Sequence, residues 1–460
     1  MLQKQSILRA QLKGYLRCSV LAAAGVLAAG SVSWAAETPL RLLSSVGIPV
    51  ATGNASGGMF SFDISFVDQG VYYLADRSNK AVDVVSAESV VTQIVPNNGH
   101  APFAGFTPCV PAAGANDCAG PNGVVAAGRW LFVTDAPSRV LSFDLSMSPP
   151  QTVSECTTKT GEKTRADELA YDPQDGLILA INNAASPPFG TLVTVDKATG
   201  HLTCGTNIPF NTANGVDAQN GAEQPVWDPG TKRFYLSIPQ IGANPTVGGV
   251  IRIGKAGKIQ ATYTITFCSP AGLALNPSSQ ELLVGCNTIW DTAGGTPPGS
   301  KWTGNADTDK DTAAPQLVIL DATTGLILAH VLGAGVGDEV WFNAGDNHYY
   351  AASSGSNLAP NALFPPRTVP ATAPTLTAQG AATLDVVDAL SRSLDQRVPT
   401  FNVPASTVPP VHPAGTAHSV AASAGTNHVF VPIAANNAVP NCLTGCVTIY
   451  GRDDPDSGSD

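Results

Sequence analysis

The fold of this chain is decided by a repeated pattern that is clearest at residues 168–182, which read ELAYDPQDGLILAIN. A short apolar run is followed by a turn and a second apolar run, and residues 224–238 and 272–286 repeat this order. An Asp-Pro or Asn-Pro step begins each turn, because proline fixes the backbone dihedral φ that a tight turn needs. Two apolar runs joined in this way predict a pair of antiparallel β-strands.

Units of this kind follow one another along the whole chain. Seven first strands begin near Asp63, Asn122, Asp167, Glu223, Ala271, Asp338 and His418. Repeated units of four short strands are typical of propeller blades. The last unit supplies only three strands and ends at residues 446–451, so residues 40–46 would add the fourth and leave no exposed sheet edge. We therefore predict an all-β fold, a seven-bladed β-propeller with the last blade closed by the N-terminal strand.

Segments at both ends fall outside the repeats. Residues 1–35 contain four basic residues, an uncharged apolar run over 18–30 and the small-residue pattern Ser33-Trp34-Ala35. This order is typical of a cleaved secretory signal peptide, and an uncleaved membrane anchor is the alternative. We expect the propeller to occupy residues 36–452 and an acidic tail residues 453–460. The protein should then be exported, to the periplasm or the extracellular space.

Charge and hydropathy exclude two classes of partner. The chain has 24 basic and 35 acidic residues; without the four basic residues of the leader, 20 remain against 35, a formal charge of −15. Such an acidic surface argues against nucleic-acid binding, which depends on Lys and Arg. No stretch after the leader reaches the roughly 18 uncharged apolar residues that a membrane span needs. We expect a monomer with neither a nucleic-acid partner nor a membrane span.

The cysteine count supports export. Nine cysteines are present, and eight remain once Cys18 leaves with the leader. An even number in an exported chain predicts a set of disulfides. The obvious local pairs are 109–118 and 442–446, and the other four cysteines could pair as 156–204 and 268–286. Metal thiolates or haem attachment are the alternative, although residues 442–446 lack the spacing and the histidine of a haem motif.

A column of polar residues marks the candidate functional site. The position five residues before each first turn holds Asp63, Asn122, Asp167, Glu223, Ala271, Asp338 and His418. In a propeller these strand starts surround one mouth of the central channel, so the column should form a ring. Neighbouring carboxylates repel one another unless they are neutralised, and oxygen ligands suit Ca²⁺. We predict a Ca²⁺ site whose ligands are Asp63, Asn122, Asp167, Glu223 and Asp338; the alternative is a hydrated collar that caps the strand starts.

One residue of the column suggests catalysis. His418 is the only histidine in it, and beside a metal it could act as a catalytic base on a docked carbonyl. A structural histidine, hydrogen-bonded at a strand start, is the alternative.

The repeated units resemble the YVTN and lactonase-type seven-bladed propellers over most of the chain. Two short segments also resemble the senescence-marker/gluconolactonase family: residues 223–228 (EQPVWD) are similar to its Glu-Gly-Pro-Val-Trp opening, and residues 121–125 (PNGVV) to its Pro-Asn-Gly-Leu. The resemblance implies that Glu223 and Asn122 are ligands of a divalent metal in an enzyme that opens lactones or hydrolyses esters. This chain departs from that family, which has six blades, places its Glu before its Asn, and has Gly where Gln224 stands.

Long irregular insertions provide a second indication of function. They cover residues 98–120, 287–314, 355–380 and 401–417, and their positions between strands predict that they gather over the ring. Loops on a rigid scaffold are the usual place for binding, and low-complexity decoration is the alternative. The alternating acids of residues 305–311 (NADTDKD) lack the Gly and the final Glu of an EF-hand and favour a solvated loop.

Two functions from different classes remain. The first is a propeller that binds a small molecule, a glycan or a protein on its loop-covered channel face, with Ca²⁺ as a possible cofactor. The second is a metal-dependent lactonase or esterase at the channel mouth, where a cation polarises a carbonyl and activates water.

Overall fold

The computed structural model describes residues 38–109, 114, 116–290, 316–334, 337–353, 382–400, 402–403, 407, 415–416 and 418–452. The predicted signal peptide and acidic tail lie outside the described residues, as do residues 355–380 and most of 287–314 and 401–417. In the described ranges, no helix is both long enough and apolar enough to cross a membrane.

Seven four-stranded antiparallel sheets form the blades, and each is numbered here in chain order. Blade 1 contains β2 (Phe62–Asp68), β3 (Val71–Asp76), β4 (Ala81–Val85) and β5 (Val91–Ile94). Blade 2 contains β6 (Val124–Ala127), β7 (Trp130–Asp135), β8 (Arg139–Asp144) and β9 (Gln151–Thr157). Blade 3 contains β10 (Leu169–Asp172), β11 (Leu177–Asn182), β12 (Phe189–Val195) and β13 (Leu202–Pro209).

The second half of the chain continues the same order. Blade 4 contains β14 (Pro225–Asp228), β15 (Arg233–Ile238), β16 (Val247–Gly254) and β17 (Ile259–Thr266). Blade 5 contains β18 (Cys268–Asn276), β19 (Glu281–Ile289), β20 (Gln316–Asp321) and β21 (Ile327–Leu332). Blade 6 contains β22 (Gly337–Asn343), β23 (His348–Ser353), β24 (Thr383–Asp388) and β25 (Ser393–Pro399). A short 3₁₀ helix, η1 (Thr212–Asn214), precedes blade 4, and the two-residue strands β26 (Asn402–Val403) and β27 (Gly415–Thr416) precede blade 7.

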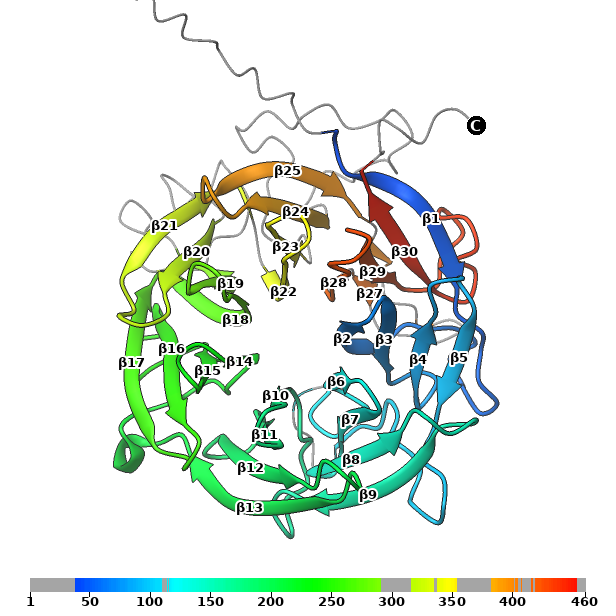
Figure 1. The fold of residues 1–460 in the computed structure, drawn as a ribbon, viewed down its shortest axis with the longest axis horizontal. Coiled ribbons are helices and arrows are strands. Elements are labelled where there is room, and N and C mark those ends of the chain that lie inside the picture. The colour runs from blue at the N-terminus through cyan, green and yellow to red at the C-terminus, as the bar shows by residue number, and fades with distance from the viewer. Residues whose placement is uncertain are drawn as a thin grey trace, which may run out of the picture. The chain divides into compact units, whose positions relative to one another are not determined.

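Blade 7 joins the two ends of the propeller. Its order is β28 (Ala421–Ala422), β29 (Val429–Ile433), β30 (Cys446–Gly451) and β1 (Arg41–Gly47). Strand β1 pairs antiparallel with β30, from Arg41 opposite Gly451 to Gly47 opposite Cys446. The predicted closure by the N-terminal strand is therefore confirmed, and Figure 1 shows β1 as the outermost strand beside β30.

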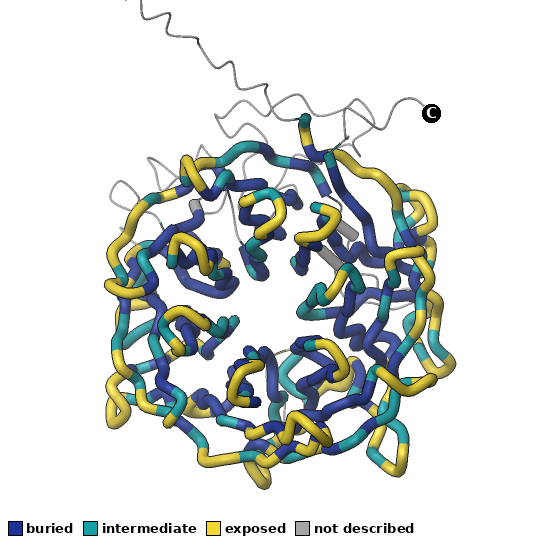
Figure 2. The backbone as a smooth tube through the Cα atoms, in the orientation of Figure 1, coloured by how far each residue is buried: buried dark blue, intermediate teal, exposed yellow. Residues whose placement is uncertain are grey.

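The core lies between neighbouring blades. Between blades 3 and 4, for example, Leu179 and Ile181 of β11 pack in one cluster with Phe234 and Leu236 of β15, and all four are buried completely. Alternate residues of a strand point to opposite faces of its sheet, so a blade covered on both sides needs apolar residues at successive positions. In Figure 2 the inner strands are buried while the turns that join them are exposed.

All eight cysteines of the described residues form disulfides, as the sequence predicts. The pairs are Cys109–Cys118, Cys156–Cys204, Cys268–Cys286 and Cys442–Cys446. The second pair connects the outer strands β9 and β13 of blades 2 and 3, and the third connects β18 to β19 within blade 5. Disulfides persist in oxidising compartments, which is compatible with export.

Candidate functional site

The central channel has two chemically different mouths. Each blade contributes its first strand to the channel wall (Figure 1). We call the end where these strands begin the strand-start mouth, and the end where they turn into the second strands the turn mouth. The predicted ring belongs to the strand-start mouth.

The structure brings two of the ring residues onto one arginine. Arg77, which follows β3 and is 2% exposed, forms an ion pair with Asp63. Its Nε also donates a hydrogen bond of 2.9 Å to Oδ1 of Asn122. The Asn122 amide nitrogen donates in turn to the carbonyl oxygens of Ala119 and Ala166, at 3.0 and 2.9 Å. Both polar groups of the buried Asn122 are therefore hydrogen-bonded within the protein.

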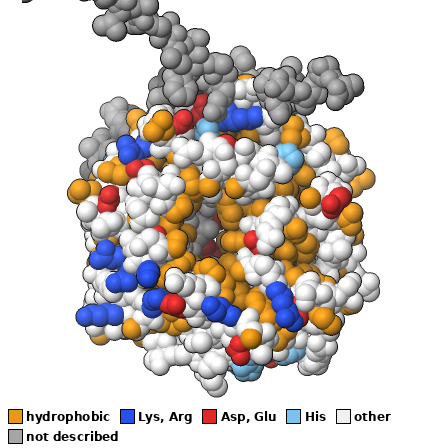
Figure 3. Space-filling model, in the orientation of Figure 1, with side chains coloured by type: hydrophobic (Ala, Val, Ile, Leu, Met, Phe, Trp, Pro, Cys, Tyr) orange, Lys and Arg blue, Asp and Glu red, His pale blue; other side chains and the backbone are white. Residues whose placement is uncertain are grey.

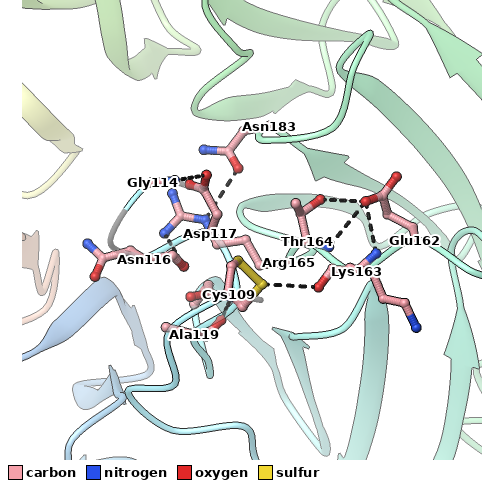
Figure 4. The surroundings of a disulfide bond; sticks show 12 residues. Cys109, Gly114, Asn116, Asp117, Ala119, Glu162, Lys163, Thr164, Arg165 and Asn183 are labelled. Atoms are coloured by element: carbon pink, nitrogen blue, oxygen red, sulfur yellow. Dashed lines mark hydrogen bonds between the residues drawn. A yellow bond between two sulfur atoms is a disulfide. The ribbon is translucent and has the colours of Figure 1, made fainter. Parts of the chain in front are cut away.

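A second arginine holds another part of the ring. Arg165 donates from Nη2 to Oδ2 of Asp167 at 2.9 Å and from Nε to Oδ1 of Asn183 at 3.3 Å. The loop closed by the Cys109–Cys118 disulfide holds it from the other side, because Asn116 accepts a 3.4 Å hydrogen bond from its Nη1 (Figure 4). This described part of the insertion over residues 98–120 thus contacts the arginine that holds Asp167. That the long insertions gather over the ring stays a prediction.

The remaining ring residues complete the circle without an arginine ion pair among the described residues. Nε2 of His418 lies 3.6 Å from Oδ1 of Asp63. Asp338 accepts a 3.0 Å hydrogen bond from the amide of Asn287. The carboxyl groups of Asp167 and Asp338 both act on Glu223 and raise its pKa. Ala271 is the one apolar member of the column.

Burial and the two arginines divide the ring carboxyls into two kinds. Burial disfavours the ionised form of Asp63, but Arg77 and His418 outweigh it and hold the pKa of Asp63 at about 2. Burial raises the pKa of Asp167 to about 7, against the attraction of Arg165. Burial and the neighbouring Asp167 raise the pKa of Glu223 to about 8. Near neutral pH the negative charge of the ring is therefore reduced in two ways, by protons on Asp167 and Glu223 and by the two arginines.

The arginines were missed by sequence reasoning, although a signal was present. Arg77 comes directly after the second strand of its blade, and Arg165 stands two residues before Asp167. Both supply positive charge that we had assigned to a bound cation. Across the described ranges, no three His, Cys, Asp or Glu side chains are placed to share one metal ion. Calcium binding at the ring, and catalysis by His418, stay predictions.

The turn mouth contains a cavity that the sequence did not predict. It has a volume of about 350 Å³ and is walled by half-buried aromatic side chains, namely Phe66, Tyr171, Trp227, Trp341 and Phe342. We call these five residues the aromatic collar. Hydrophobic side chains surround the central opening in Figure 3. The sequence signal was the position just before the turn residue Asp or Asn, which is aromatic at Tyr171, Trp227 and Phe342.

The next row of residues, one position after the ring column, includes the polar residues Glu168, Gln224, Glu339 and Ser419. In blade 6, Glu339 accepts the backbone N–H of Val420 of blade 7 at 3.1 Å and that of Ser65 at 3.3 Å. In blade 4, Gln224 accepts the N–H of Leu273 of blade 5 at 2.6 Å. These side chains connect one blade to the next. In both cases the donor stands two positions after the ring column of the following blade.

Glu168 of blade 3 stands at the same position but makes no such bond. The residue of blade 4 that aligns with Leu273 and Val420 is Pro225, which has no N–H to donate. Glu168 is 6% exposed, its Oε2 has no hydrogen-bond partner in the described part of the chain, and it lines the cavity. Burial, followed by the charges of Asp167 and Glu223, raises the pKa of Glu168 well above its usual value.

Comparison with known proteins supports the fold alone. No family model and no curated protein matches the sequence. Among solved structures, the chain is similar to one from a "Crystal Structure of Mitotic Checkpoint Complex", at 12% identity and a TM-score of 0.52, covering 95% of this chain and 100% of that one. The seven-bladed propeller is thereby confirmed, whereas membership of the YVTN or lactonase type stays a prediction. The chain is a seven-bladed β-propeller whose family the comparisons do not define.

Proposed function

We propose that this propeller is a non-catalytic binding protein that takes a small molecule into its channel through the turn mouth. The observation that carries the proposal is the cavity itself: five aromatic side chains enclose about 350 Å³ above a buried carboxyl with an unsatisfied oxygen. Small-molecule sites are concave, mostly apolar and fixed by a few polar groups, and this cavity has all three properties.

The aromatic collar supplies the binding energy in this proposal. Trp227 of blade 4 and Trp341 of blade 6 both line the cavity. Phe66 and Trp341 already meet edge to face, with ring centroids 5.2 Å apart. A planar apolar ligand would extend this packing, because aromatic pairs contribute beyond the area they bury.

A neutral fluorescent probe tests the proposal. N-phenyl-1-naphthylamine becomes more fluorescent in apolar surroundings, and we expect saturable binding. Trp227→Ala should weaken it at least tenfold, since removing a buried aromatic contact costs about 1–3 kcal/mol. Trp130→Phe is the matched control, because Trp130 packs between blades 2 and 3 and does not line the cavity. Equal binding by the parent protein and Trp227→Ala would contradict the proposal.

The hydrolase alternative belongs to the opposite mouth and is favoured by the contact between His418 and Asp63. Burial lowers the pKa of His418, but Asp63 and Asp338 outweigh it and raise the pKa above its usual value. A general base must be neutral, so activity of this kind should increase with pH. Hydrolysis of simple lactones and aryl esters by the parent protein, lost in His418→Ala, would support this alternative over simple binding.

A further inference from the structure

Glu168, which lines the cavity, has a buried oxygen without a hydrogen-bond partner in the described part of the chain. The two other long polar side chains of the same row, Gln224 and Glu339, accept backbone N–H groups of the following blade. Pro225 removes that donor for Glu168 alone among the three. Buried polar atoms without a partner are costly and therefore uncommon, so each one calls for an explanation. A ligand group that donates a hydrogen bond to Glu168 would explain this oxygen.

The charge around the cavity indicates which donor fits. The described residues that line it include Glu168 but no Lys, Arg or His. After burial, the largest influences on the pKa of Glu168 come from the carboxyl groups of Asp167, Glu223, Asp63 and Glu339. A buried carboxyl surrounded by other carboxyls favours a positive partner, because the partner compensates both the burial and the repulsion. An anionic group on the ligand would instead be repelled by these carboxylates.

The aromatic collar fits the same ligand. An ammonium group is attracted to the face of Trp, Tyr or Phe within about 6 Å of the ring centroid. Tyr171 of β10 lies three residues after Glu168, and both residues line the cavity. One segment therefore supplies an aromatic side chain and the carboxyl. The rest of the collar would enclose the apolar body of the ligand.

We propose that the cavity selects a small organic ammonium ion with an apolar body, whose N–H donates to Glu168 while the body packs against the aromatic collar. This inference rests on the proposed function, since it names the ligand class of the same cavity. It assigns Glu168 as the residue that determines charge specificity, and Pro225 as the residue that keeps Glu168 available.

Three ligands with one body test the charge preference. At neutral pH, 2-phenylethylamine is a cation, 2-phenylethanol is neutral and phenylacetate is an anion, and titration calorimetry with the full protein measures each. We expect the amine to bind at least about tenfold more tightly than the alcohol, because hydrogen bonds to charged groups are stronger than neutral ones. Phenylacetate should bind most weakly.

Two substitutions assign the preference to Glu168. Glu168→Gln keeps the shape but removes the charge, and it should reduce binding of the amine about tenfold while leaving the alcohol unchanged. Pro225→Ala gives Glu168 a backbone donor, so it should also weaken the amine selectively. Glu88→Gln, in an exposed turn of blade 1, is the control for a lost carboxylate and should change nothing.

The outcomes separate this inference from the proposed function. Equal binding of amine and alcohol, or an amine preference that survives in Glu168→Gln, would overturn the ammonium assignment and leave a cavity for neutral ligands. No binding of any of the three ligands, together with no binding of the naphthylamine probe, would overturn both. Selective loss of amine binding in Glu168→Gln and Pro225→Ala would support the inference.

Discussion

Pro225 denies Glu168 the hydrogen bond that its position in the blade would otherwise provide. The equivalent residues Leu273 and Val420 donate their N–H groups to Gln224 and Glu339 of the preceding blade. The difference is one missing proton on one backbone nitrogen. It leaves Glu168, a residue that lines the cavity, with a buried oxygen that has no hydrogen-bond partner among the described residues.

Replacing Pro225 should therefore change the ionisation of Glu168 more than the stability of the fold. Pro225→Ala loses the stiffness of proline, worth about 0.4–1 kcal/mol, and gains a hydrogen bond worth about 1 kcal/mol. We expect the free energy of unfolding in urea to change by less than about 1 kcal/mol. The pKa of Glu168 should fall, because an N–H donor stabilises the carboxylate. Carboxyl carbon NMR across a pH titration measures it, and an unchanged pKa would contradict the proposed pairing.

The closing strand should be needed for stability. Deleting residues 39–47 removes β1 and the side chains of Leu40 and Val46, which are 1% and 9% exposed. Their burial alone contributes roughly 3–6 kcal/mol, and β30 would become an open edge. We expect a sharply lower Tm by differential scanning calorimetry. Deletion of residues 453–460 is the control, and an equal Tm for both deletions would show that closure does not matter.

The ring should make the protein less stable as the pH rises from about 5 to 8.5. Glu223 and Asp167 have pKa values of about 8 and 7 in the folded protein, so the folded state binds more protons than the unfolded state over this range. Stability then falls with pH, by at most about 1.4 kcal/mol per pH unit for each group. The raised pKa of His418 has the same sign. Glu223→Gln should flatten the dependence of Tm on pH, and an unchanged slope would contradict the assigned pKa.

The sequence predicted the fold more fully than the site, for a physical reason. Blade number, disulfide pairing and the closure by β1 follow from repeated apolar runs, from the number of strands in each unit and from the count of cysteines, all of which a single sequence displays. The ring column was also visible, because its members align on a turn. Its charge balance was not, since Arg77 and Arg165 come from other positions in their blades. The orphaned oxygen of Glu168 depends on a proline in the next blade, and only the inter-blade pairing gives that proline its meaning.

The calcium site predicted at the ring can be tested through its protons. A cation bound there must displace the protons that Glu223 and Asp167 hold near neutral pH, so Ca²⁺ affinity should rise between pH 6 and 9. Calorimetric titration of chelator-treated protein should show binding heat that Glu223→Gln removes. Glu88→Gln serves again as the control. No heat and no thermal stabilisation by Ca²⁺ at pH 9 would end this prediction.

Ammonium binding in the cavity should release a proton from Glu168. Burial and the neighbouring carboxyls raise the pKa of Glu168 well above its usual value, and pairing with an ammonium group favours the ionised form. The complex then holds fewer protons than the free protein, so affinity for 2-phenylethylamine should increase with pH, by at most about tenfold per pH unit. Calorimetry in buffers of different ionisation enthalpy measures the released proton directly.

The proton released by Glu168 must be distinguished from protons released by other titrating groups near it. Asp63, Asp167, Glu223 and Glu339 all act on Glu168, and Tyr171 shares the cavity. Burial raises the pKa of Tyr171 above its usual value, so this phenol stays protonated between pH 6 and 8. Glu223→Gln should preserve the proton release, whereas Glu168→Gln should abolish it together with the pH dependence. Release that persists in Glu168→Gln would assign the proton to the ring and remove Glu168 from ligand recognition.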